Sequence, residues 1–213
     1  MFKDLESKYI IFGATGVIGT ELQELLREAN TLAVVRRKGS AIDGVREIVH
    51  TDLLDISPLS TELEDANVLI ALGTTKAKTP DKEKYYQIDH DMPVHIAAQA
   101  KDSGARTVHV ISAMGADPES RIFYNATKGK MERDVKEVFP EAYFYRPSLI
   151  MGDRDEMRIG ESIAKGFFSL INTILPRKYR GIYPRKIART IIDNCRQVPN
   201  KKIWENDDML NKF

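Results

Sequence analysis

Three glycines spaced three residues apart are the part of the sequence with the clearest chemical meaning. Gly13, Gly16 and Gly19 lie in the segment GATGVIG, directly after the apolar run at residues 9–12. Glycine allows a tight turn and a close approach of the backbone to a pyrophosphate, whose charge is met by unpaired amides and a helix dipole. The spacing differs by one residue from the common G-x-G-x-x-G pattern. The interpretation as a pyrophosphate-binding turn therefore depends on the strand before it and the helix after it. The alternative is three glycines that only form a turn.

Two arginines, Arg36 and Arg37, follow the next apolar run at residues 31–35. About 20 residues after the glycine turn, dinucleotide-binding folds place an acid that binds the ribose of NAD, or an arginine that accepts the extra phosphate of NADP. A guanidinium group binds that phosphate through paired, charge-assisted hydrogen bonds, whereas an acid would repel it. The sequence therefore predicts NADP(H) as the cofactor. The alternative is that both arginines are simply solvated surface residues.

Tyr124 and Lys128 are four residues apart on a predicted helix, so they project from one face. A neighbouring ammonium group stabilises a phenolate and favours a lower tyrosine pKa, which suits a proton donor to a carbonyl oxygen. Ser112 follows the predicted strand at residues 107–111, at the edge where open α/β sheets bind ligands, and its hydroxyl is placed to hold a substrate oxygen. The alternative for the pair is a packed ring beside a solvated amine.

Alternating strands and helices must position these residues. Short apolar runs indicate buried parallel strands. Apolar residues at helical spacing indicate helices that each pack one apolar face against the sheet. Asn30 is expected to end the first helix, and Pro147 the last strand. Strands are predicted at residues 9–12, 31–35, 47–50, 68–72, 107–111 and 142–145, and helices at residues 17–28, 58–63, 85–102, 124–138, 160–172 and 184–195.

This order implies right-handed crossovers between parallel strands. The predicted fold is α/β, a single doubly wound parallel sheet (Rossmann fold) with a small C-terminal helical extension. We expect one domain over residues 1–213, in which residues 151–213 form the small substrate-side part, because 213 residues suit one domain better than two.

The motifs ALGTT at residues 71–75 and YNATK at residues 124–128, together with GATGVIG, resemble the atypical branch of the short-chain dehydrogenase/reductase superfamily. VVRRK, LGTTKAK, SAMGAD and GDRDEMRIGE extend the resemblance over nearly the whole chain, towards the Tat-interacting-protein oxidoreductase group. The resemblance implies that Ser112, Tyr124 and Lys128 are catalytic, and that Tyr124 and Lys128 also contact the cofactor. Polar residues often stand in this group where Val17 and Ile18 stand here, so backbone amides must replace any side-chain contact to phosphate.

The same resemblance implies a set of cofactor contacts along the chain. The diphosphate would lie on Gly13, Thr15, Gly16, Val17, Ile18 and Gly19, the 2′-phosphate on Arg36 and Arg37, the adenine on Asp52 and Leu53, the adjoining ribose on Leu72 and Gly73, and the nicotinamide on Pro147, Leu149 and Ile150, while Arg158 would reach back to the cofactor.

Composition narrows the remaining classes of protein. Hydrophobic residues make up 42% of the chain and charged residues 30%, which are globular values, and the net charge of +1 gives no broad surface for nucleic acid. The longest apolar stretches fall short of a membrane-spanning helix. A single cysteine, Cys195, excludes an internal disulfide, and no charged-then-apolar leader is seen, so we expect a cytoplasmic protein.

No metal site is predicted, because the four histidines are scattered and no cysteine pair accompanies them. Lys128, Lys130 and Arg133 are expected to form a solvated helix face whose charge Glu132 and Asp134 cancel.

Two functions fit these observations best. The first is an NADPH-dependent oxidoreductase that reduces a small-molecule carbonyl substrate, with Tyr124 as the acid, Lys128 as its electrostatic partner and Ser112 as the holder of the oxygen. The second is an NADPH-binding regulatory module that acts through a protein partner, since the segment after Pro147 leaves little chain for a substrate pocket. Epimerisation of a nucleotide sugar is a third reading, and it normally needs a larger C-terminal domain than residues 151–213.

Overall fold

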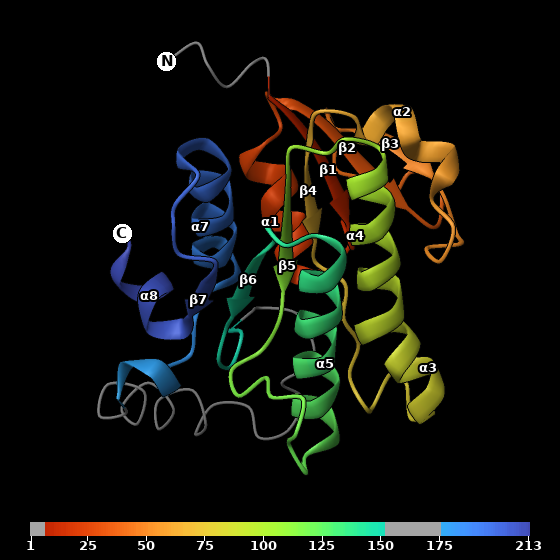
Figure 1. Cartoon of the computed structure of the whole chain (residues 1–213). Coiled ribbons are helices and arrows are strands. Elements are labelled where there is room, and N and C mark those ends of the chain that lie inside the picture. The colour runs from red at the N-terminus through yellow and green to blue at the C-terminus, as the bar shows by residue number, and fades with distance from the viewer. Residues whose placement is uncertain (1–6, 152–175) are drawn as a thin grey trace.

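A parallel sheet of seven strands forms the centre of the molecule in the computed structural model, which describes residues 7–151 and 176–213 (Figure 1). The strand order is β3-β2-β1-β4-β5-β6-β7. The chain adds β2 and β3 on one side of β1 and then β4 to β7 on the other side, so the strand order reverses between β1 and β4. The strands are β1 (Lys8–Phe12), β2 (Asn30–Val35), β3 (Arg46–Val49), β4 (Ala66–Ile70), β5 (Thr107–Ile111), β6 (Tyr143–Arg146) and β7 (Ile203–Glu205). The predicted doubly wound α/β fold is confirmed.

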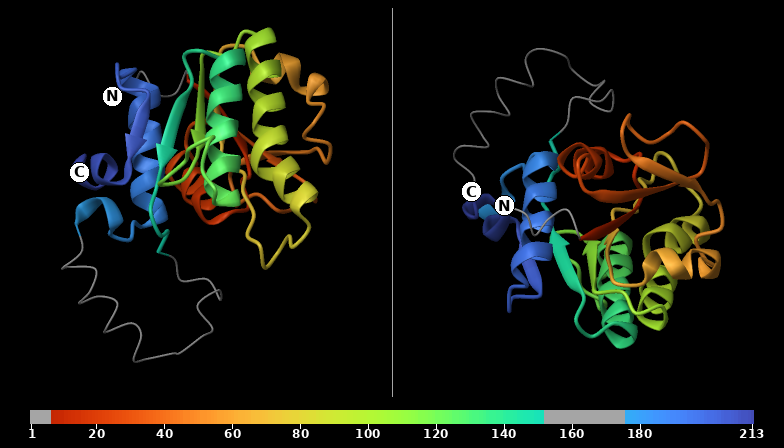
Figure 2. Two further views of the ribbon diagram at one scale, coloured as in Figure 1. Left: turned by 60° about the horizontal axis from the view of Figure 1, so that its bottom comes forward. Right: turned by 90° about the horizontal axis from the view of Figure 1, so that it is seen from above.

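Helices cover both faces of the sheet (Figure 2). Successive residues of a strand point to opposite faces, so β1 sends Tyr9 and Ile11 to one core cluster and Ile10 and Phe12 to the other. This explains why inner strands such as β1, β4 and β5 read as largely apolar runs, because both of their sides are buried. The first cluster is covered by α1 (Val17–Leu25) and α7 (Pro184–Gln197), and the second by α2 (Ser60–Leu63), α4 (Met92–Asp102) and α5 (Phe123–Val138).

The helix predicted at residues 85–102 is divided by a π-helical turn. It consists of α3 (Lys82–Tyr86), the turn η2 (Gln87–Asp91) and α4. Pro93 has no N–H to donate to the carbonyl of Asp89 one turn earlier, so the regular helical ladder is interrupted at this point. The wider turn directs Asp89 inward to Lys128, and it directs His90 to Asp134 at 2.8 Å.

The C-terminal part contributes a strand to the central sheet in addition to the predicted helices. After η3 (Arg177–Tyr179) and α7, the chain adds β7 beside β6 as a seventh strand, and α8 (Asn206–Asn211) follows. Three residues of β7 are too short to give a periodic sequence signal, and only pairing with β6 defines them as a strand. The helix predicted at residues 160–172 lies outside the described residues.

Two other element boundaries differ from the sequence expectation. The first helix ends at Leu25, and Asn30 begins β2 instead of ending that helix. The fourth strand covers residues 66–70, so Leu72 lies beyond the strand end. In residues 7–151 and 176–213, no helix combines the length and the apolar character that a membrane crossing requires.

A buried polar network joins β5, β6 and α7 inside the first core cluster. His109 is 1% exposed, its Nδ1 lies 2.9 Å from the Tyr145 hydroxyl, and its Nε2 lies 3.0 Å from Oγ1 of Thr107. The side-chain amide of Asn194, on α7, donates to the same tyrosine oxygen at 2.9 Å. Burial lowers the pKa of His109 to about 3, with a further contribution from Lys202, so the imidazole is neutral in the folded protein at neutral pH.

We expect His109 to make the protein acid-sensitive. Between about pH 6.5 and pH 3 the unfolded chain binds a proton at this residue and the folded chain does not, so stability falls as the pH is lowered. The contribution is about 1.4 kcal/mol per pH unit within that window. Urea unfolding at pH 7 and at pH 4.5 should therefore show a smaller acid-induced loss in His109→Gln than in the wild type. His95→Gln, on the exposed face of α4, is the control, and equal pH slopes for His109→Gln and the wild type would contradict the expectation.

Candidate functional site

The predicted site residues gather at the carboxyl edge of the sheet. Gly13 follows β1, Arg36 follows β2, Ser112 follows β5 and Pro147 follows β6. Because the strands are parallel, these strand ends meet along one edge, and the strand order reverses between β1 and β4, which is where open α/β sheets bind their ligands. The fold therefore brings together residues that are more than 130 positions apart in the chain.

Two glycines make the first turn possible. Gly13 has a φ of +82°, and a Cβ atom on it would lie 2.4 Å from the carbonyl oxygen of Ala71. A Cβ on Gly19 would lie 2.1 Å from the carbonyl oxygen of Gly13. Any side chain at either position would collide with backbone, so Gly13 is required for the close approach of the turn to the segment after β4, and Gly19 for the close approach of α1 to the turn.

The amino end of α1 is open to an anion. Gly16 is the N-cap and supplies no side-chain hydrogen bond, and the first turn of the helix contains no acidic residue. Thr15, Gly16 and Val17 are exposed, whereas Ile18 and Gly19 are buried against the sheet. The positive end of the helix dipole therefore lies beside exposed residues that carry no acidic side chain, which fits a diphosphate group.

Arg36 and Arg37 lie exposed at the end of β2. Among the described residues, neither arginine has a carboxylate within ion-pair distance, so both guanidinium groups are available to another anion. The loop that follows them is held by Glu47 of β3, whose carboxylate accepts hydrogen bonds from the amides of Gly39, Ser40 and Ala41. These bonds lower the pKa of Glu47 and keep its side chain ionised.

Lys128 and Ser112 meet at the end of β5. The Lys128 side chain is 4% exposed, and its Nζ lies 3.4 Å from the carbonyl oxygen of Ile111, the residue before Ser112. Ser112 is 3% exposed, and its Oγ has no hydrogen-bond partner among the described residues. A buried hydroxyl without a partner is costly, and it is often retained where a ligand supplies the missing bond.

Asp89 is a functional candidate that sequence reasoning missed. Its Oδ1 lies 2.9 Å from Nζ of Lys128, its Oδ2 accepts the amide of Thr74 at 2.9 Å, and its side chain is 1% exposed. Helical spacing could have indicated that Asp89 is buried. It falls on the same face of the predicted helix as Tyr85 and Ile96, and both of these residues are buried. A carboxylate on an apolar face needs a buried partner, and Lys128 is that partner.

The electrostatic surroundings of Tyr124 differ from the prediction. The residue is 40% exposed at the start of α5, and desolvation raises the pKa of its phenol. Lys128 lowers the pKa of Tyr124 as expected, but Asp89 raises it, and the net direction is upward. The prediction of a lowered pKa was wrong mainly because the sequence did not show how strongly the phenol would be desolvated, and Asp89 adds a smaller upward contribution. The phenol remains protonated, which suits an acid.

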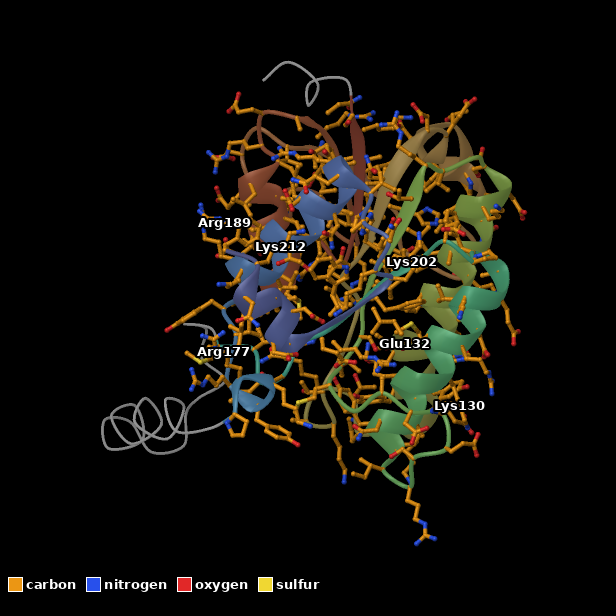
Figure 3. The ribbon with its side chains drawn as sticks, turned by 60° about the vertical axis from the view of Figure 1, so that its left-hand side comes forward. Lys130, Glu132, Arg177, Arg189, Lys202 and Lys212 are labelled. Atoms are coloured by element: carbon orange, nitrogen blue, oxygen red, sulfur yellow. The ribbon has the colours of Figure 1, made fainter. Side chains whose placement is uncertain are left out.

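The predicted solvated face of α5 is also corrected. Lys128 and Glu132 point inward and are buried, whereas Arg133 is exposed. The Glu132 carboxylate binds the Arg146 guanidinium through two hydrogen bonds of 2.9 and 2.6 Å. Glu132 and Lys202 line one hollow between α5 and the edge of the sheet (Figure 3). Glu132 therefore fixes α5 to β6 instead of only cancelling surface charge.

The other predicted contacts also lie beyond the strand ends, with different exposure. Pro147 is buried, and its carbonyl accepts the amide of Met114 at 2.9 Å. Arg158 lies outside the described residues. Leu53 is buried and Leu72 and Ile150 are half-buried, whereas Asp52, Gly73 and Leu149 are exposed. In the described part of the chain, no group of three or more histidine, cysteine or acidic side chains is arranged to hold a metal ion.

The Lys128 and Asp89 pair can be tested by unfolding. Removing one charge of a buried pair typically costs about 3 to 5 kcal/mol, because the other charge stays buried and unpaired. We expect Asp89→Asn to lower the free energy of unfolding at pH 7 by roughly that amount, although Asn can still accept the Thr74 amide. The double variant Asp89→Asn, Lys128→Met should recover part of this loss. Additive losses in chemical denaturation would show that the two residues are not coupled.

Comparison with known proteins agrees with this geometry. A family model described as NAD(P)H-binding matches residues 13–143. The chain is 36% identical over 188 residues to "Protein FMP52, mitochondrial" of Saccharomyces cerevisiae, which covers 84% of this chain and 79% of that protein. The protein of the same name from Eremothecium gossypii is 31% identical over 178 residues, covering 81% of this chain and 77% of the relative. Both are FMP52 proteins, and neither is named for Tat interaction.

Solved structures share the fold at low sequence identity. The structure described as MoeE5 in complex with UDP-glucuronic acid and NAD superposes with a TM-score of 0.69 and 18% identity, covering 93% of this chain and 75% of the other. At this identity the likeness supports the Rossmann-type fold and nothing finer.

The prediction of a cytoplasmic protein was wrong. The curated relatives from Saccharomyces cerevisiae, Eremothecium gossypii and Emericella nidulans all carry mitochondrial names. The inference rested on a single cysteine and on a charge pattern near the start of the chain. Neither feature separates one reducing compartment from another, because the folded domain has the same physical requirements in both.

Proposed function

The chain belongs to the NAD(P)H-binding family, and from that premise we propose that it is an NADPH-dependent oxidoreductase of the atypical short-chain dehydrogenase/reductase type that reduces a carbonyl compound. The observation that carries the proposal is the group at the end of β5, where the unpartnered Ser112 hydroxyl lies beside the buried Lys128 and Asp89 pair. The likeness to the Tat-interacting-protein oxidoreductases, based on VVRRK and GDRDEMRIGE, is part of the same proposal.

The cofactor fits the carboxyl edge of the sheet. The exposed amides at the start of α1 would hold the diphosphate, and Arg36 and Arg37 would hold the 2′-phosphate. Lys128 and the backbone around Pro147 would contact the nicotinamide half. When bound, NADPH supplies a hydride equivalent for the reduction of a carbonyl carbon.

The residues of the chain supply the proton and hold the oxygen. The Ser112 hydroxyl donates a hydrogen bond to the carbonyl oxygen, which satisfies a group that has no other partner among the described residues. The Tyr124 phenol, kept protonated by desolvation and by Asp89, donates the proton to the same oxygen. The Lys128 ammonium then stabilises the phenolate that remains, and Asp89 keeps that ammonium in place.

A regulatory module that binds NADPH without turnover is the second candidate. The observation that favours it is the exposed apolar surface beside the site, where Leu149 is 52% and Ile122 62% exposed. Tight NADPH binding without consumption by any carbonyl compound would support the module. Steady consumption of NADPH with a carbonyl compound would support the enzyme.

The phosphate preference depends on the arginine pair. In Arg36→Glu, Arg37→Glu we expect the affinity for NADPH to fall by about 100-fold, because two charge-assisted hydrogen bonds are replaced by repulsion. The affinity for NADH should change much less. The control is Lys101→Glu, Lys136→Glu, with the same charge change in the last turns of α4 and α5, at the opposite edge of the sheet. Isothermal titration calorimetry measures the affinities of the wild type and both variants for each nucleotide, and an equal loss for NADPH and NADH in the arginine variant would contradict the assignment.

The role of Tyr124 is tested by removing its hydroxyl. We expect Tyr124→Phe to bind NADPH as the wild type does and to reduce carbonyl compounds about 10² to 10⁴-fold more slowly, since a general acid contributes in that range. NADPH consumption with a panel of aldehydes and ketones gives the rate, and calorimetry gives the binding. Tyr86→Phe, on α3, should retain full activity. Unchanged turnover in Tyr124→Phe would show that Tyr124 is not the proton donor.

A further inference from the structure

Four consecutive amides in the loop after Arg36 and Arg37 donate to side chains of other elements. The amides of residues 39–41 donate to the Glu47 carboxylate, at 2.6 Å from Gly39 and 3.1 Å from the other two. The fourth amide, of Ile42, donates to Oε1 of Gln23 at 3.0 Å. Surface loops are usually more mobile than the elements they connect, whereas these four side-chain contacts restrict the backbone of residues 39–42 without any ligand.

Gln23 connects this loop to the glycine turn. It lies on α1 and is 1% exposed, and its Nε2 donates to the carbonyl oxygen of Ala14 at 2.8 Å while its Oε1 accepts from Ile42. Ala14 precedes Thr15 and Gly16, which are exposed residues at the start of α1. One buried side-chain amide therefore spans the two loops that the proposed function assigns to the two phosphate groups of the cofactor.

We propose that Gln23 is a positioning residue that holds the Arg36 and Arg37 loop in register with the glycine turn, and that the preference for NADPH over NADH depends on it. This inference rests on the proposed function. The diphosphate and the 2′-phosphate belong to one ligand, so their protein contacts must keep a fixed separation. A loop that is already ordered loses less conformational entropy when its arginines bind the phosphate. The glycine turn is also held by the close backbone contacts of Gly13 and Gly19, so it serves as the anchor, and Gln23 acts on the arginine loop through the Ile42 amide.

Glu47 holds the same loop but has a different role. Its side chain is half-buried, and its carboxylate fixes residues 39–41 to β3. Gln23 fixes the loop to α1, the helix whose amino end faces the diphosphate. The Gln23 side chain is neutral, so unlike the Glu47 carboxylate it adds no negative charge near the arginines. Loss of Gln23 would free the loop from the glycine turn and leave its attachment to the sheet intact.

The test compares two leucine variants of the full chain. Gln23→Leu keeps a side chain of similar size and loses both hydrogen bonds, so we expect the affinity for NADPH to fall about tenfold and that for NADH less than about twofold. Gln99→Leu is the matched control. Gln99 also spans a loop, accepting from the Ile56 amide at 2.8 Å and donating to the Leu54 carbonyl at 3.4 Å, beside the residues assigned to the adenine. Both nucleotides carry adenine, so Gln99→Leu should change both affinities by the same factor.

Calorimetry with NADPH and NADH separates the outcomes. A reduced NADPH to NADH preference in Gln23→Leu alone supports the inference. If the wild type prefers NADPH and folded Gln23→Leu keeps the full preference, the inference is overturned and the proposed function stands. If the wild type binds neither nucleotide, the proposed function fails and the inference fails with it.

Hydrogen exchange on the wild type provides a test that does not depend on the folding of a variant. We expect the amides of residues 39–42 to exchange slowly without nucleotide. NADH and NADPH should change the exchange rates of these amides little. Fast exchange in the free protein, slowed only by NADPH, would show that the ligand orders the loop and would overturn the role of Gln23.

Discussion

The close contacts of the glycine turn, with α1 at Gly19 and with the backbone after β4 at Gly13, are the constraint on which the rest of the site depends. No Cβ atom can be accommodated at Gly13 or Gly19, because carbonyl oxygens of Ala71 and Gly13 occupy that space. These contacts bring the amino end of the helix to the carboxyl edge of the sheet and set the direction of α1. Gln23 projects from that helix, so the same contacts also decide where the arginine loop can be held.

Burial of charge governs the other half of the site. Lys128 is inside the protein, and an unpaired ammonium group there would be strongly disfavoured, so the Asp89 carboxylate is required. The pair has opposite effects on Tyr124, since the lysine favours the phenolate and the aspartate favours the phenol. A tyrosine that stays protonated in the free protein is suited to donate a proton, which agrees with reduction of a carbonyl compound as the proposed direction of the reaction.

Local sequence signals were sufficient for most of the sheet. Continuous apolar runs located six of the seven strands within two residues, and the glycine spacing after the first strand located the anion-binding turn. The π-helical turn at residues 87–91 and the strand at residues 203–205 were not located. Both depend on contacts with other parts of the chain: Asp89 contacts Lys128, and β7 exists only through its pairing with β6.

The sequence by itself determined the order of strands and helices, and therefore which residues would meet at the carboxyl edge of the sheet, because parallel strands joined by right-handed crossovers leave few alternatives. The tertiary structure alone decided which charges are buried together. Lys128 and Asp89 are 39 residues apart, and Gln23 and Ile42 are 19 residues apart, so no local pattern indicates that either pair is in contact. Charge state and loop position depend on such distant partners, because a buried polar group must find its partner wherever the fold brings one within hydrogen-bond distance.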